Sequence, residues 1–124
     1  MKQDTKWVDH PDIGVTVTDF KGIIVSMNKA ACQTFKGDGG ARLLGSNLFD
    51  CHPEPSKSKL RKLYEEKRPN HYFITSKTGQ AKIIHQIPWY NQEKFAGFVE
   101  ISIPLPRTNL PHFDRRKSEV EKNG

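Results

Sequence analysis

Short segments of alternating apolar and polar residues lie at both ends of the sequence, and this pattern constrains the fold most. Near the N-terminus, Ile13, Val15 and Val17 alternate with glycine and threonine. Period-two alternation rich in β-branched residues is typical of a half-buried strand. A turn containing Gly22 leads to a second apolar segment over 23–27, so the two segments predict a β-hairpin.

The C-terminal half predicts three more strands, over 71–76, 81–90 and 95–104. Short polar turns separate them, as expected for consecutive hairpins. Pro88 lies inside the middle strand and cannot donate a ladder hydrogen bond. It therefore predicts either a β-bulge or an unpaired edge at that end of the strand.

The segment between the two sets of strands is predicted to be helical. Asn28 can cap a short helix over 29–35, and a further helical turn is expected at 41–44. The stretch 47–55 is expected to be irregular because prolines do not fit a helix interior. A longer amphipathic helix is predicted over 56–67. The element order β-β-α-α-α-β-β-β predicts an α+β fold, with a five-stranded antiparallel sheet and helices packed on one face.

A chain of 124 residues corresponds to one domain with short extensions. We expect an N-terminal extension over 1–11, the domain over 12–106 and a polar tail over 107–124 whose last ten residues are disordered. No apolar stretch approaches the roughly 20 residues that a membrane-spanning helix needs, and the N-terminus does not have the pattern of a signal peptide. We therefore expect a soluble cytoplasmic protein without a membrane partner, in which Cys32 and Cys51 are free thiols.

The net charge of +6 raises the question of a nucleic-acid partner. The segment 54–68 contains six Lys or Arg against three Glu, and the segment 105–124 contains five against three acidic residues. A run of charges on a helix is usually a solvated face, and the tail is mixed in sign. The pattern therefore disfavours nucleic-acid binding, although a basic nucleic-acid-associated regulator stays an alternative.

Several segments, taken in order, resemble the PAS domain family. They are the first hairpin followed by Asn-Lys-Ala-Ala at 28–31, Leu-Gly-Ser-Asn-Leu-Phe-Asp at 44–50, His-Pro-Glu at 52–54, and the closing strand at 95–101. The resemblance implies a curved sheet with helices across it, enclosing a pocket for a metabolite or cofactor. It also implies that signals leave through the sheet or flanking helices, often across a dimer interface.

The covalent light-sensing chemistries of that family lack their cysteines here. The Gly-Ser-Asn at 45–47 is followed by Leu48, where a flavin-binding member has cysteine, and Pro53 is followed by Glu54, where a photoactive yellow protein has cysteine. The long helix also lacks the axial histidine that is common in haem-binding members. Light sensing through a flavin bound to cysteine, or through the covalent chromophore of a photoactive yellow protein, is therefore disfavoured.

Two histidines are the candidates for a cofactor ligand. His52 is interpreted as an ordinary capping residue, and His85 as a core or pocket histidine on the same strand parity as its isoleucine neighbours. A haem or other cofactor-based redox or gas sensor using either one stays an alternative. The pair Cys51 and His52 has no further ligand at metal-site spacing, and the sequence contains no catalytic motif. We therefore expect neither a metal site nor an enzyme.

A ligand pocket is expected on the apolar parity of the strands and the apolar faces of the helices. Its predicted lining is Val17, Val25, Met27, Phe35, Leu44, Leu48, Leu60, Leu63, Tyr72, Ile74, Ile83, His85, Ile87 and Ile101. These side chains could equally fill a closed core. Aromatic residues around the last hairpin predict an interface on the outer sheet face, for a homodimer or another partner, formed by Trp89, Tyr90, Phe95 and Phe98. The alternative is that Trp89 and Phe95 complete the core while Tyr90 and Phe98 are partly exposed.

Together these features predict a sensory or signal-transduction module that binds a small molecule or a protein partner. With the domain over 12–106 and the tail after it, we expect no output domain in this chain. The response would then pass to a separate effector protein.

Overall fold

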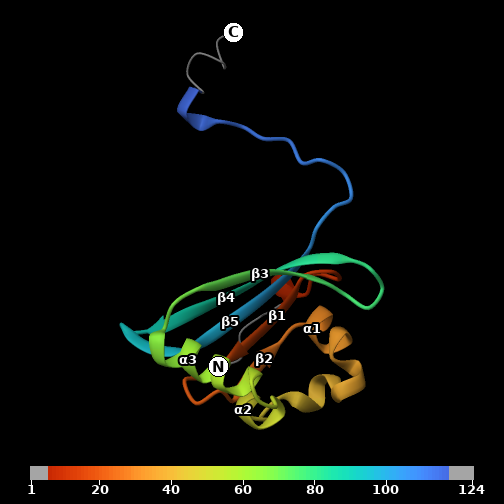
Figure 1. The fold of residues 1–124 in the computed structure, drawn as a ribbon. Coiled ribbons are helices and arrows are strands. Elements are labelled where there is room, and N and C mark those ends of the chain that lie inside the picture. Colours follow the sequence, from red (N-terminus) through yellow and green to blue (C-terminus); the bar gives the residue numbers. More distant parts are fainter. Residues whose placement is uncertain (1–5, 118–124) are drawn as a thin grey trace.

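Five antiparallel strands form one open sheet in the computed structural model, which describes residues 6–117 (Figure 1). The strands are β1 (Gly14–Thr18), β2 (Ile24–Met27), β3 (Asn70–Thr75), β4 (Ala81–Asn91) and β5 (Lys94–Pro104). Their spatial order is β2-β1-β5-β4-β3, so β1 and β5 pair and join the two ends of the domain. The predicted hairpins and the α+β sheet architecture are confirmed.

The segment between β2 and β3 covers one face of this sheet (Figure 1). It contains the helices α1 (Lys29–Thr34), α2 (Leu48–Cys51) and α3 (Ser56–Glu66), and the 3-10 segments η2 (Lys36–Asp38) and η3 (Gly40–Leu43). Two further 3-10 segments lie outside the sheet region, at η1 (Lys6–Val8) and η4 (Arg115–Lys117). The helices and the sheet therefore form two layers.

Helix α2 corrects the expectation of an irregular stretch over 47–55. The Asn47 side chain accepts a hydrogen bond from the Phe49 amide at 2.8 Å and so caps the helix. The helix ends at Cys51, before Pro53 could interrupt it. The prolines thus limit its length without preventing it from forming.

Asn28 ties the N-terminal segment, β1 and α1 together. As predicted, it caps α1, because its Oδ1 accepts from the Ala31 amide at 3.0 Å. The same oxygen accepts from the Val15 amide at 2.9 Å, and Nδ2 donates to the carbonyls of Val8 and Ile13, each at 2.7 Å. All the polar capacity of this buried side chain is therefore used to fix where β1 meets α1.

Pro88 combines both of the predicted arrangements. A bulge follows it, between Trp89 and Tyr90, where the β4–β5 register shifts. On the other edge of β4, the pairing with β3 begins at Asn70 and Gln86, so Pro88 lies beyond the end of β3. The missing amide of proline therefore leaves no gap in the ladder.

The chain after β5 extends away from the sheet (Figure 1). Leu110 and Phe113 are exposed there, and η4 is the last described element. The expected disorder of the last ten residues falls mostly on residues 118–124, which lie outside the described residues. Over residues 6–117, none of the helices combines the length and the hydropathy that crossing a membrane requires.

Candidate functional site

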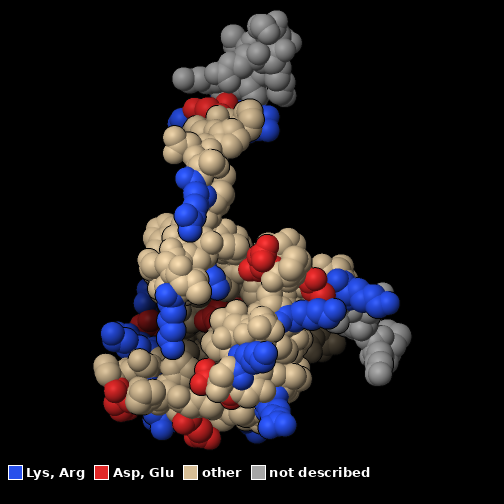
Figure 2. All heavy atoms as spheres, turned by 90° about the vertical axis from the view of Figure 1, so that its right-hand side faces the viewer, with Lys and Arg blue, Asp and Glu red and all other residues tan. Residues whose placement is uncertain are grey.

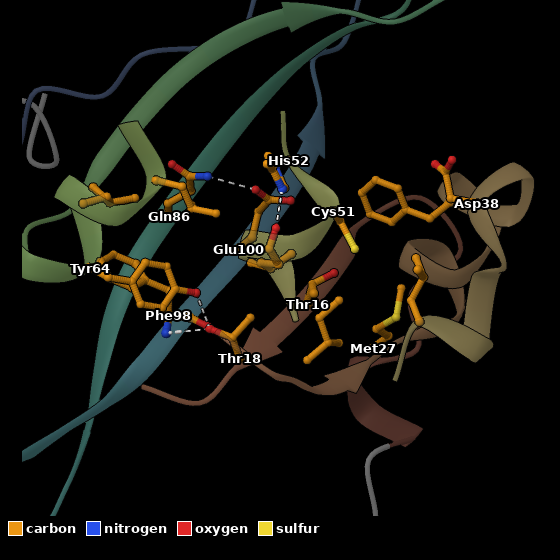
Figure 3. A pocket seen from close by; sticks show the side chains of 16 residues that line it. Thr16, Thr18, Met27, Asp38, Cys51, His52, Tyr64, Gln86, Phe98 and Glu100 are labelled. Carbon is orange, nitrogen blue, oxygen red and sulfur yellow. Dashed lines mark hydrogen bonds between the residues drawn. The ribbon is translucent and has the colours of Figure 1, made fainter. Parts of the chain in front are cut away.

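A cavity of about 510 Å³ lies between the inner face of the sheet and the helices that cover it (Figure 3). Strands β1, β2, β4 and β5 form one wall, and α2, α3, η2 and η3 contribute to the other. Its described lining combines apolar side chains with several polar ones. These residues are Thr16, Thr18, Ile24, Met27, Phe35, Asp38, Leu43, Leu48, Cys51, His52, Leu60, Leu63, Tyr64, Gln86, Phe98 and Glu100.

Glu100 is held on the sheet wall by a short chain of amide side chains. Gln86 Nε2 donates to Glu100 Oε1 at 3.1 Å, as Figure 3 shows. Asn70 Nδ2 in turn donates to Gln86 Oε1 at 2.8 Å, which fixes the orientation of the glutamine amide. The three residues lie directly across neighbouring strands, since Asn70 pairs with Gln86 and Gln86 pairs with Glu100. The carboxylate is therefore positioned by the register of the sheet.

Burial raises the pKa of Glu100 above its ordinary value. Two weaker effects oppose this: the hydrogen bond from Gln86 and the positive field of His52. The side chain keeps some exposure because it borders the cavity, while protein atoms surround it on its other sides. Glu100 is thus a carboxyl group partly removed from water, an arrangement more typical of functional sites than of structural ones.

His52 faces the same part of the cavity from the end of α2 (Figure 3). Its Nδ1 lies 2.7 Å from the Leu48 carbonyl oxygen, which can only accept, so Nδ1 carries a proton. This leaves Nε2 as the nitrogen available to a ligand. The residue therefore lines the cavity in addition to closing α2, whereas the sequence analysis interpreted it only as a capping residue.

An aromatic and hydroxyl cluster closes the cavity at the other end. The hydroxyls of Tyr64 and Thr18 form a hydrogen bond, and Thr18 Oγ1 also accepts from the Phe98 amide at 3.3 Å. The rings of Tyr64 and Phe98 pack with their centroids 4.7 Å apart. Burial raises the pKa of Tyr64, so its phenol stays neutral at physiological pH. This cluster fastens α3 to the centre of the sheet.

The structure brings five of the fourteen predicted lining residues to the cavity: Met27, Phe35, Leu48, Leu60 and Leu63. Of the other nine, Val25 and Leu44 are exposed. Tyr72 and Ile74 lie on β3 and are outside the lining. The remaining five share the odd parity of their strands and face away from the cavity: Val17, Ile83, His85, Ile87 and Ile101.

The sequence analysis therefore assigned the wrong set of alternating strand residues to the cavity. In β1, Thr16 and Thr18 line the cavity, so Val15 and Val17 point to the opposite face. In β5, Glu100 lines it, and the strand residues on either side of it face outward. The parity of Val15, Val17 and Ile101 forms the outer face of the sheet, and the opposite parity, which mixes polar and apolar residues, forms the cavity wall.

The four predicted interface residues are placed differently from one another. Phe98 is buried, at 4% exposure, and lines the cavity instead of the outer face. Phe95 is half-buried and packs edge-on against Tyr64 and Phe98, with centroids 6.2 and 5.7 Å away. Tyr90 is exposed and packs against Phe95.

Trp89, the fourth of these residues, is anchored within its own chain. Its Nε1 donates to the Thr18 carbonyl at 2.9 Å, across its register partner Gly97. Gly97 has φ of 146°, and the Thr18 carbonyl oxygen lies 2.0 Å from where a Cβ would stand. A side chain at position 97 is therefore excluded.

Sequence reasoning missed the polar half of the lining, above all Glu100, Gln86 and Thr16. One available signal was a carboxylate in the centre of a strand with apolar neighbours on both sides, since a glutamate in a buried position needs a partner. Cys32 and Cys51 are free, as expected. Within residues 6–117, no three His, Cys, Asp or Glu side chains are grouped as metal ligands.

Comparisons with known proteins show similarity in structure only. No family model matches the chain, and no curated protein matches it. A C-terminal domain from Streptococcus mutans matches with a TM-score of 0.65 and 19% identity, covering 79% of each chain. The Aer2 receptor of Vibrio cholerae, described as a dual PAS-heme oxygen sensor, matches with a TM-score of 0.57 and 21% identity over 76% of this chain and 95% of that one. The PAS domain of the histidine kinase ThkA matches with a TM-score of 0.59 and 22% identity over 74% and 98%.

Proposed function

The chain has the PAS fold, and on this premise we propose that it is a cytoplasmic sensory module that binds a small molecule and passes the binding event to a separate protein. The observation that carries the proposal is the cavity of about 510 Å³ between sheet and helices. Its lining has the character of a ligand site, with mostly apolar walls and a few convergent polar groups such as Glu100 and His52.

Native mass spectrometry of freshly purified protein tests this proposal first. We expect a non-covalent small molecule to co-purify, or a compound library to yield ligands that raise Tm by binding the folded state. Leu63→Trp should fill the cavity and abolish both effects, whereas Lys62→Trp, at an exposed position of α3, should preserve them. Circular dichroism would establish that both variants are folded. If no ligand is found, or if Leu63→Trp retains it, the cavity is not a ligand site.

We also propose that the outer face of the sheet pairs with a second copy of the chain. This face is rich in apolar side chains, and Phe73 and Ile87 on it are exposed. Burying such a surface would supply the hydrophobic contribution to a dimer. The partner would then lie on the opposite side of the sheet from the cavity, so that a change at Glu100 could reach it through β5.

Sedimentation over a range of protein concentrations tests the pairing. We expect Phe73→Asp to shift the protein toward monomer, because it would bury a charge in the interface. Phe20→Asp serves as the matched control, since Phe20 is also exposed but lies in the turn between β1 and β2. Identical sedimentation of the wild type and Phe73→Asp at every concentration would count against the pairing.

His52 is the one observation that favours a haem-based sensor, because it lines the cavity and its Nε2 is not used by the contact with Leu48. His85 lies on the outer face. The rest of the lining fits a haem poorly: its described residues include Asp38 and Glu100 but no Lys or Arg to balance the propionates. We therefore rank this candidate second. A Soret band in the purified protein, lost in His52→Ala, would reverse the ranking.

A further inference from the structure

The cavity and the rest of the chain differ in the sign of their charge. The chain as a whole carries a net charge of +6, and Lys and Arg side chains are spread over the surface seen in Figure 2. Among the sixteen described residues that line the cavity, two are carboxylic acids, Asp38 and Glu100, and none is Lys or Arg. His52 is the one lining side chain among them that can become cationic. Asp38 is exposed at the edge of the cavity, so an organic anion inside it would meet the carboxylate of Glu100 with no Lys or Arg of the described lining to compensate.

One oxygen of Glu100 is available to a ligand. Oε1 accepts from Gln86, whereas Oε2 has no hydrogen bond to any described residue. Among the described residues, no buried side-chain nitrogen or oxygen lacks a partner, so Oε2 is open to the cavity. Gln86 cannot rotate to serve both oxygens, because its own oxygen is held by Asn70. A partly desolvated carboxylate oxygen without a partner is stabilised by a hydrogen-bond donor, which a ligand in the cavity could supply.

Thr16 adds a second polar group on the neighbouring strand. It is the register partner of Glu100 on β1, it lines the cavity, and its hydroxyl forms no hydrogen bond with the described residues. A donor group with more than one N–H could thus reach both Glu100 and Thr16. The apolar part of the same molecule would lie against Leu48, Leu60 and Leu63 on the helical wall.

We propose that the ligand is a small organic molecule with an apolar body and a basic N–H group, an amine or amidine, that donates to Glu100 and is selected over organic anions. The proposal rests on the function proposed above and specifies its ligand class. It also accounts for a carboxylate kept at a partly desolvated position, where a neutral side chain would cost less free energy.

Three probes that share one ring system test the charge preference: 1-naphthylmethylamine, 1-naphthamide and 1-naphthoate. Titrated into the full chain at pH 7.5 by calorimetry or NMR, the amine should bind about tenfold more tightly than the amide, and the naphthoate should be weakest. Glu100→Gln should bring the amine and the amide to within about threefold of each other. Glu65→Gln, an exposed position of α3, should leave the preference unchanged.

The pH dependence provides a second readout. Burial raises the pKa of Glu100, so lowering the pH from 8 toward 4 increases its protonated fraction and should weaken amine binding. Among the described residues, the other titratable groups of the lining are Asp38, Cys51, His52 and Tyr64, and Tyr72 lies outside the lining but within the electrostatic field of Glu100. The pH dependence of amine binding should persist in Glu65→Gln and be largely lost in Glu100→Gln.

The outcomes separate the two proposals. If Leu63→Trp abolishes probe binding but the naphthoate binds as tightly as the amine, or Glu100→Gln changes nothing, then the cavity is a ligand site and the ligand class is wrong. If no probe binds at millimolar concentration and no molecule co-purifies, both the ligand class and the function proposed for the cavity fail.

Discussion

The two faces of the sheet depart from most half-buried antiparallel sheets, which are apolar inside and polar outside. Facing the helices, the strands mix the polar residues Thr16, Thr18, Gln86 and Glu100 with apolar ones that include Ile24, Met27 and Phe98. Facing away, they present mainly apolar residues: Val15, Val17, Ile83, Ile87, Val99 and Ile101. The contrast teaches that the inner face is built to border a cavity, and that the outer face lacks a covering layer among the described residues.

The inner face is nevertheless where the packing lies. The buried apolar residues among those described include Tyr64 of α3, Phe98 of β5 and Ile84 of β4, all at less than 10% exposure. On the outer face, Phe73 is 71% exposed and Ile87 is 37% exposed. An apolar side chain on that face is therefore worth little to the monomer, and its value must come from an added partner.

Replacing one phenylalanine on each face provides the largest expected contrast. Phe98→Ala should lower the free energy of unfolding by about 3–5 kcal/mol, because it leaves a cavity against the Tyr64 ring. Phe73→Ala, the matched change on the outer face, should cost less than about 0.5 kcal/mol in the monomer. Urea denaturation at low protein concentration measures both. Equal losses would mean that the inner face is not the core.

The alternation that revealed the strands could not reveal which parity faces the helices. In β1, Val17 and Thr18 differ in polarity as a half-buried strand should, and assigning the valine inward follows the usual rule. The assignment fails because a cavity replaces part of the core. Asn28, by contrast, was correctly predicted as the cap of α1, since a cap depends on residues three positions apart.

The polar contacts of the site join residues that are distant in sequence. Gln86 and Glu100 meet because β4 and β5 pair in one register, and Thr18 meets Tyr64 across 46 positions. Neither pair has a local pattern that a single sequence displays. The helical part of the lining, including Leu60 and Leu63, was predictable because helical periodicity shows an apolar stripe whatever it packs against.

Removing one hydroxyl from each of two tyrosines gives a smaller contrast between the interior and the surface. Tyr64→Phe should cost about 1–2 kcal/mol, because the buried Thr18 hydroxyl loses its partner and keeps only its contacts with the Phe98 backbone. Tyr90→Phe, at an exposed position, should change stability very little. Chemical denaturation of the two variants measures this difference. A loss in Tyr90→Phe as large as that in Tyr64→Phe would contradict the assigned role of the Thr18 contact.

The smallest expected effect is a gain in stability, and it depends on pH. Because burial raises the pKa of Glu100 in the folded protein, the folded chain holds this proton over a pH range, starting near 4.5, in which the unfolded chain has lost it. The free energy of unfolding therefore falls as pH rises through that range. Glu100→Gln does not titrate, so its Tm should match the wild type near pH 4 and exceed it at pH 8. Glu65→Gln should show no such divergence, and a Glu100→Gln protein less stable than the wild type at pH 8 would mean that the carboxylate stabilises the fold instead of serving a ligand.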